Sequence, residues 1–205
     1  MVSSNSYTRR VTEDVGRRGR PRSERARTAV LNAVDDLLVE VGYAAMTMKS
    51  IAERAGVSRQ TVYRWWSTKA EILLEASAAD AEEELAVEPA SSPLGELNAY
   101  LGALARFLSR SPAGAAYRAL LGEAQHDNEV AALLERNDFL LDSARTVLSR
   151  VVDPNRLALG ADQAAALLVG PTFFWVLSGH DADELDTEQL AATFLDLVAA
   201  HVTPS

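Results

Sequence analysis

Between Arg59 and Arg64 the chain places side chains that can read the edges of DNA bases. Arginine donates two parallel hydrogen bonds to guanine, glutamine pairs with adenine, and threonine offers a hydroxyl and a methyl group. The residues of these types here are Arg59, Gln60, Thr61 and Arg64. The alternative is a solvated helix face whose polar side chains read nothing. The hypothesis therefore depends on the element that presents them.

Two adjacent tryptophans, Trp65 and Trp66, indicate how such an element is held. Neighbouring residues on a helix point about 100° apart, so the two indoles face different sides. Val62 and Trp66 share one side, which predicts that both are buried. Trp65 is expected to be more exposed, with an indole N–H that can donate to a phosphate. Other side chains suited to phosphate, where contacts position without specifying, are Thr47, Tyr63 and Lys69.

The elements that must position these residues are predicted to be helices. Apolar residues recur at three-and-four spacing over residues 25–41, and Gly42 ends that helix. Thr47 caps a short second helix, and Gly56 breaks it. A third helix runs from the cap Ser58 to about residue 66, and a fourth spans about 69–85. A tight glycine turn before the third helix is the spacing of a helix-turn-helix.

The rest of the chain also has helical periodicity. Ser92 and Ser111, each followed by proline, are expected to begin helices. One long helix is predicted over 128–151, one over 162–177 with a kink at Pro171, and one over 186–202. No alternating strand pattern occurs, so we predict an all-α fold of about nine helices. The expected parts are an arm (1–22), a helix-turn-helix domain (23–68) and a C-terminal domain (69–205).

Charge is divided unevenly along the 205 residues, although the net charge is −9. Residues 1–70 carry 13 Lys and Arg against seven Asp and Glu, whereas residues 71–205 carry seven against 22. This asymmetry indicates a basic module that meets a polyanion and an acidic body that does not. The chain has no cysteine and no long apolar run, which argues against disulfides, membrane insertion and secretion and favours a cytoplasmic protein.

Enzymatic chemistry finds little support in the residue pattern. The histidines, His126, His180 and His201, are far apart and form no metal-binding pair, and no phosphate-binding glycine loop occurs. We therefore expect no catalytic residues, no metal site and no cofactor.

The stretch MTMKSIAERAGVSRQTVYRWWSTKAEIL, residues 46–73, resembles the DNA-binding segment of TetR-family transcriptional regulators. The matching features include Thr47, the turn at residues 55–58, the paired aromatics and Lys69. The resemblance covers roughly residues 24–75. It departs at Gln60, where the family often has glycine, and this longer side chain leaves the operator sequence open.

The resemblance implies a homodimer of all-helical subunits that binds double-stranded DNA. The third helix would enter the major groove, with Arg59, Gln60, Thr61 and Arg64 near bases. The residues implied to contact the DNA backbone are Thr47, Lys49, Tyr63, Trp65 and Lys69. The C-terminal domain would dimerise and bind a small effector. The expected function is a repressor released from a palindromic operator by an apolar or aromatic effector; the alternative is a regulator with no small-molecule effector, controlled by a partner protein or constitutive.

The segment GRRGRPRS, residues 16–23, resembles an AT-hook core, whose extended arginines enter a narrow A·T minor groove. On that hypothesis Arg20 and Arg22 contact DNA. The alternative is a solvated tail that adds only nonspecific attraction.

Two further sets of residues are candidates in the C-terminal domain. The first could form a four-helix dimer interface, or simply internal core: Leu167, Leu168, Pro171, Phe174, Leu190, Phe194, Leu197 and Val198. The second could line an effector pocket, although each is also an ordinary core or surface residue: Tyr100, Phe107, Tyr117, Arg118, His126, Phe139, Phe173 and Trp175.

Overall fold

The computed structural model describes residues 20–153 and 159–199, and within them all regular structure is helical. The N-terminal unit comprises α1 (Arg20–Ala45), α2 (Met48–Arg54) and α3 (Arg59–Tyr63). The following helices are α4 (Lys69–Leu85), α5 (Pro93–Arg110), α6 (Pro112–Ala124), α7 (Asn128–Arg136), α8 (Phe139–Val151), α9 (Ala161–Leu177) and α10 (Thr187–Ala199), with a short 3-10 turn η2 (Ala182–Glu184) before α10. The predicted all-α class is confirmed.

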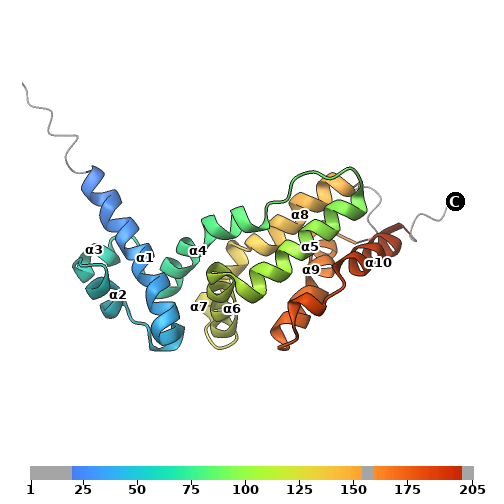
Figure 1. The fold of residues 1–205 in the computed structure, drawn as a ribbon. Helices are drawn as coiled ribbons and strands as arrows, with labels where there is room; N and C mark the ends of the chain where they lie inside the picture. The colour runs from blue at the N-terminus through green and yellow to red at the C-terminus, as the bar shows by residue number, and fades with distance from the viewer. Residues whose placement is uncertain (1–19, 154–158, 200–205) are drawn as a thin grey trace, which may run out of the picture.

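The helices form a small N-terminal unit and a larger body joined by α4 (Figure 1). Helix α4 packs against α1 on the side of the small unit and against α6 in the body. Within the body, α5 packs against α6, α9 and α10, and α8 packs against α9. Helices α9 and α10 therefore lie at the end of the molecule opposite α2 and α3 (Figure 1).

Four helices begin at the caps that the sequence predicts. The hydroxyls of Thr47, Ser58, Ser92 and Ser111 each accept a hydrogen bond from the amide three residues later. These bonds satisfy amides that have no partner within the helix. The starts of α2, α3, α5 and α6 are thus set locally, before any tertiary contact forms.

Helix α1 begins earlier than its apolar periodicity predicts. It starts at Arg20 and includes Pro21 in its first turn, where a missing amide hydrogen costs nothing. Arg20 and Arg22, expected in an extended arm, therefore belong to the helix backbone, and the remainder of the predicted arm lies outside the described residues. Gly42 interrupts the helix as expected, with a φ of 75°.

The prediction of a single helix over 128–151 is wrong. Helix α7 ends at Arg136, and Asn137 has a non-helical φ of −137°. The carboxylate of Asp138 then accepts the amide of Leu141 at 3.1 Å and starts α8. Apolar periodicity continues across this break because α7 and α8 both bury residues in the same core. The described part of the chain consequently contains ten α-helices, in line with the all-α fold of about nine helices expected.

Helices α5 and α6 approach each other closely at Gly114. Ser111 ends α5 and caps α6, and its hydroxyl also donates to the Glu84 carboxylate at 2.7 Å. A Cβ on Gly114 would lie 1.8 Å from the carbonyl oxygen of Phe107. A side chain at this position is therefore incompatible with the observed turn.

We expect Gly114→Ala to lower the free energy of unfolding by about 2–3 kcal/mol, because the backbones of α5 and α6 must separate. Gly122→Ala on the same helix is the matched control, since its Cβ would meet no atom within 4 Å. That control should gain about 0.5–1 kcal/mol from helix propensity. Urea unfolding of both variants measures the difference, and equal effects would contradict the close approach.

Candidate nucleic-acid interface

Helix α3 is held in place by two buried side chains. The helix has only five residues and follows α2 through a four-residue turn in which Gly56 has a φ of 65°. So short a helix is not stable alone in water. Val62 is fully buried and Trp66 is 3% exposed, as the sequence predicts. The amide of Trp66 still donates to the carbonyl of Val62 at 3.1 Å, so the helical turn continues past Tyr63.

The opposite side of α3 presents polar side chains to solvent. The side chains of Arg59, Gln60 and Tyr63 are exposed and make no hydrogen bond or ion pair with any other described residue. Their donors are therefore available to a ligand. Arg64 is also exposed, and its guanidinium lies 4.7 Å from the ring centroid of Trp65. Thr61 is half-buried and shares a hydrogen bond of 2.9 Å with the hydroxyl of Ser58.

The start of α2 lies on the surface and is capped by Thr47 and Ser50. The hydroxyl of Thr47 accepts from the amide of Ser50, and the hydroxyl of Ser50 accepts in return from the amide of Thr47, both at 3.0 Å. Lys49 is exposed and forms a loose ion pair of 3.8 Å with Glu53. Such exposed pairs contribute little, so Lys49 can exchange partners readily.

Glu75 connects three elements beneath α3. Its Oε2 accepts the indole N–H of Trp66 at 3.0 Å, and its Oε1 lies 2.8 Å from the guanidinium of Arg27 on α1. The Arg27 guanidinium also lies over the Trp66 ring, 5.9 Å from the centroid. One carboxylate on α4 thus fixes the end of α3 and the start of α1. The sequence reasoning missed this role, although residues 71, 75, 78 and 82 share one helix face and three of them are glutamates.

Lys69 makes contacts that its residue type did not indicate. Its ammonium donates to the carbonyls of Tyr43 at 2.8 Å and Met46 at 3.1 Å. It also lies 4.1 Å from the centroid of the Tyr43 ring. These contacts tie the first residue of α4 to the end of α1. A DNA contact by Lys69 stays a prediction, and a structural role competes with it.

The contact between α1 and α4 also contains an unfavourable charge arrangement. Burial, together with the nearby carboxylates of Asp80 and Asp36, raises the pKa of Asp35 to about 6. The penalty of ionising Asp35 is absent below its ordinary pKa of 3.8 and fully present above about pH 6. At neutral pH the contact between α1 and α4 is therefore weaker than its apolar packing alone would make it.

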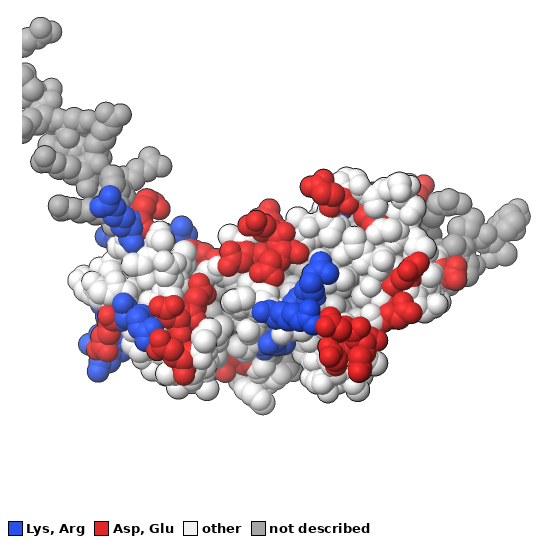
Figure 2. Space-filling view, viewed as in Figure 1, with Lys and Arg blue, Asp and Glu red and all other residues white. Residues whose placement is uncertain are grey.

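Charge on the surface follows the division expected from the sequence. On the face shown in Figure 2, acidic side chains lie along the whole molecule, whereas basic ones gather at the end formed by α1–α3 and in one patch near the middle. Helix α2 contributes Arg54, whose guanidinium pairs with Glu40 and Asp36 of α1. Arg54 is therefore paired within the protein, whereas the side chain of Arg59 on α3 has no such partner among the described residues.

Comparison with known protein families identifies both parts of the chain. Residues 30–76 match the model described as bacterial regulatory proteins, tetR family, and residues 87–198 match the tetracyclin repressor-like C-terminal domain. The chain belongs to the TetR family. It is accordingly a DNA-binding transcriptional regulator, and the resemblance inferred from residues 46–73 is confirmed.

Individual relatives of this TetR-family chain agree with that assignment. It is 34% identical over 169 residues to the uncharacterized HTH-type transcriptional regulator YdeS of Bacillus subtilis, covering 80% of this chain and 85% of the relative. It is 30% identical over 145 residues to the transcriptional repressor TetR of Mycobacteroides abscessus, covering 69% and 76%. Its fold is similar to that of Salmonella enterica GusR, with a TM-score of 0.61 and 19% identity over 86% of this chain and 95% of the other.

The body of this TetR-family chain contains a cavity of about 870 Å³ between α4 and the α7–α8 segment. Trp65 and Trp66 are among the residues that line it. Trp65, expected to contact DNA, is half-buried here, and its DNA contact stays a prediction. Of the eight residues predicted to bind an effector, Phe139 lines this cavity.

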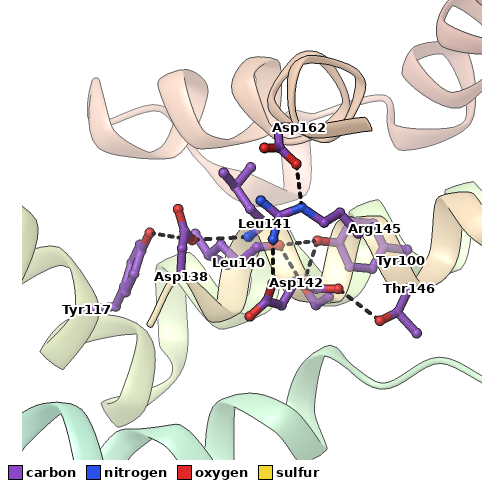
Figure 3. A network of polar contacts seen from close by, with 10 residues as sticks. Tyr100, Tyr117, Asp138, Leu140, Leu141, Asp142, Arg145, Thr146 and Asp162 are labelled. Atoms are coloured by element: carbon purple, nitrogen blue, oxygen red, sulfur yellow. Dashed lines mark hydrogen bonds and ion pairs between the residues drawn. The ribbon is translucent and has the colours of Figure 1, made fainter. Parts of the chain in front are cut away.

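The other predicted effector residues lie elsewhere. Tyr100 and Phe107 are fully buried in the core, and Tyr117 is nearly so. The Tyr100 hydroxyl shares a hydrogen bond of 2.9 Å with Ser143, and that of Tyr117 donates to Asp138 at 3.5 Å (Figure 3). Burial raises the pKa of both tyrosines. These rings therefore support α8 and do not face the cavity.

The remaining four lie on or just after α6 and on α9. Arg118 on α6 is half-buried, and His126 near the end of α6 is exposed. Phe173 is half-buried on α9. Trp175 donates its indole N–H to the carbonyl of Asp181 at 2.8 Å and stacks on His180. Residue type alone could not show that these side chains do not converge.

The residues predicted for the dimer interface divide into three groups by burial. Leu168 and Phe194 are buried within their own subunit, at 3% and 5% exposure, so they are core residues. Leu190 and Val198 are partly buried against that core. The exposed members of the set are Leu167, Pro171, Phe174 and Leu197.

None of the described helices is both long and apolar enough to cross a membrane.

The two roles of Lys69 can be separated by the salt dependence of DNA binding. We expect Lys69→Met to lower the free energy of unfolding by about 1–2 kcal/mol, because the carbonyls of Tyr43 and Met46 lose their donor. The slope of log affinity against log salt should not change, whereas loss of one phosphate contact would reduce it by about 0.9. Lys49→Met is the comparison variant, and a reduced slope for Lys69→Met would restore the phosphate contact.

Proposed function

We propose that this TetR-family chain is a cytoplasmic homodimeric repressor that reads a palindromic operator with α3 and is released by a small-molecule effector. The observation that carries the proposal is the contrast between the two sides of α3. Val62 and Trp66 are buried. The side chains of Arg59, Gln60 and Tyr63 are exposed and form no hydrogen bond or ion pair with other described residues. A fixed helix with unengaged donors is what base reading in the major groove requires.

Dimerisation through α9 and α10 is supported by the apolar surface of α9. Residues 163–179 contain no charged side chain, so α9 is apolar on all sides. One side is buried in the subunit, but Leu167, Phe174 and Leu177 are 39%, 73% and 43% exposed. Leu197 on α10 adds to this surface at 48%. A helix that is apolar all round requires a partner on its exposed side.

Response to an effector is supported by the cavity between α4 and α7–α8. A volume of about 870 Å³ can hold a small organic molecule, and its walls include the anchor of α3, Trp66. Repression follows if two α3 helices lie about one DNA turn apart, roughly 34–36 Å, and an effector favours a different separation. Names of relatives such as the M. abscessus repressor favour repression over activation.

The reading helix is tested by binding a pool of random DNA duplexes, with selection and sequencing. Wild type should recover a palindrome. Arg59→Gln and Gln60→Ala should each weaken binding to it by about 1–3 kcal/mol and relax preference at particular positions. Arg54→Gln removes one charge from the same module, but its guanidinium is paired with Glu40 and Asp36. That control should keep the sequence preference, and equal losses in all variants would mean that charge alone drives binding.

The dimer is tested by sedimentation of the full chain at micromolar concentration. Wild type should have the mass of two subunits, and Phe174→Glu should have the mass of one, because a carboxylate would be buried without a partner. Val39→Glu is the control, since Val39 is 81% exposed on α1 at the other end of the molecule. A Phe174→Glu protein that stays dimeric would place the interface elsewhere.

A further inference from the structure

The cavity between α4 and α7–α8 has walls that suit an organic ligand with an aromatic or apolar body. Trp65 and Trp66 contribute to the lining, with ring centroids 5.5 Å apart in an edge-to-face arrangement. Phe139 and the aliphatic side chains of Leu74 and Leu133 line the sides. Sites for drug-sized molecules have volumes of about 300–1,000 Å³, and this cavity falls within that range.

The ionic side chains of the lining favour one sign of charge. Its carboxylates are Glu71, Glu75, Glu82 and Asp142, and its guanidiniums are Arg136 and Arg150. Arg150 is already committed, because it donates to the buried carboxylate of Glu96 and to the carbonyl of Val87. Two of the carboxylates are paired as well, Glu75 with Arg27 and Asp142 with Arg145, which leaves Glu71 and Glu82 against the guanidinium of Arg136. These groups repel an anion on balance and attract a cation. The body around them has the same bias, with 22 acidic and seven basic residues.

We propose that this cavity binds an organic cation with an aromatic or apolar body, and that Glu75 transmits the binding to α3. The inference rests on the proposed function in one respect, since it names the chemical class of the effector. A cation in the cavity is attracted by the carboxylates of α4, and its apolar body packs against the aromatic and aliphatic side chains of the lining. No covalent step is involved.

Glu75 contacts both the cavity and the residue that anchors α3, Trp66. It lines the cavity, accepts the indole N–H of Trp66 at 3.0 Å and pairs with Arg27 at 2.8 Å. A cation beside Glu75 competes with both partners for the same two oxygens. Loss of either contact changes how α1 and α3 are held on α4, and therefore the affinity for DNA. The coupling energy is the difference in cation affinity between the two arrangements.

The ligand class is tested with two ions of nearly equal size and shape, tetraphenylphosphonium and tetraphenylborate. Each is titrated into the full chain without DNA, and binding is followed by calorimetry and by tryptophan fluorescence. The phosphonium should bind saturably and at least about tenfold more tightly than the borate. Absence of saturable phosphonium binding, or equal or tighter borate binding, overturns the inference.

The position of the site is tested with a matched pair of carboxylates. Asp142 and Asp162 both pair with Arg145 (Figure 3). Of these two carboxylates, only Asp142 lines the cavity. Asp142→Asn should weaken phosphonium binding by about threefold, and Asp162→Asn should leave it unchanged. Equal losses, or no loss in Asp142→Asn, would show that the cation binds elsewhere.

The coupling is tested with Glu75→Gln on the operator recovered by selection. Saturating phosphonium should lower DNA affinity in wild type and have a smaller effect in Glu75→Gln, whose amide can still accept from Trp66. Glu71→Gln is the second variant, because Glu71 lines the cavity but accepts from the amide of Ser67. It should weaken cation binding and leave the full effect at saturation.

The outcomes separate the two proposals. Phosphonium binding with unchanged DNA affinity in wild type overturns the role of Glu75 and leaves the cation site standing. Failure to recover any operator overturns the proposed function, while the binding titrations without DNA still decide the ligand class.

Discussion

The burial of Trp66 is the contact on which the DNA-reading surface depends. Helix α3 has five residues and one buried side chain of its own, Val62, so it cannot fix its orientation by itself. Trp66 follows α3 by one turn, is 3% exposed, and places its indole N–H on Glu75 of α4. The direction in which Arg59 and Gln60 point is therefore set by a hydrogen bond and an apolar contact on the other side of the backbone. Replacement of solvent-facing residues changes what is read, whereas loss of Trp66 removes the reader.

Helix α4 consequently belongs to both parts of the molecule. Near its start, Lys69 holds the end of α1 and Glu75 holds Trp66 and Arg27. Farther along, the same helix packs on α6 and α8 and forms one wall of the cavity. Only about 9 Å of helix separates residue 69 from residue 75, at a rise of 1.5 Å per residue. A change in the cavity therefore reaches the DNA-binding unit without any intervening element. Burial, together with the nearby carboxylates of Asp80 and Asp36, raises the pKa of Asp35, so its ionised form weakens the contact between α1 and α4.

Local signals predicted the parts of the fold that local interactions determine. The caps Thr47, Ser58, Ser92 and Ser111 were identified because a hydroxyl and an amide three residues away form a bond within one turn. The break at Asn137 was missed because the apolar residues on both sides of it enter one core, so periodicity continued where the backbone did not. The apolar type of Leu168 on α9 and Phe194 on α10 fits either an interface or internal core. Spacing cannot show which side of these helices the subunit itself covers, and both side chains are buried within it. Tyr100 and Phe107 were assigned to a pocket by residue type, but the location of a cavity depends on how α4, α7 and α8 pack, which no single segment encodes.

The uneven charge of the chain has two physical consequences that arise from the same field. Residues 71–205 carry seven basic and 22 acidic residues, so the body repels a polyanion and confines its approach to the end formed by α1–α3. The same negative potential raises the local concentration of cations, and the cavity opens within this body next to the DNA-binding unit. Screening in physiological salt limits such fields to about 8 Å. Glu75 both lines the cavity and accepts the indole N–H of Trp66, so a ligand charge beside it lies within that range of the Trp66 contact. A cation bound there would change the potential at the boundary between the acidic body and the basic module. Electrostatics alone therefore gives α4 a way to respond to a ligand, in addition to any movement of its side chains.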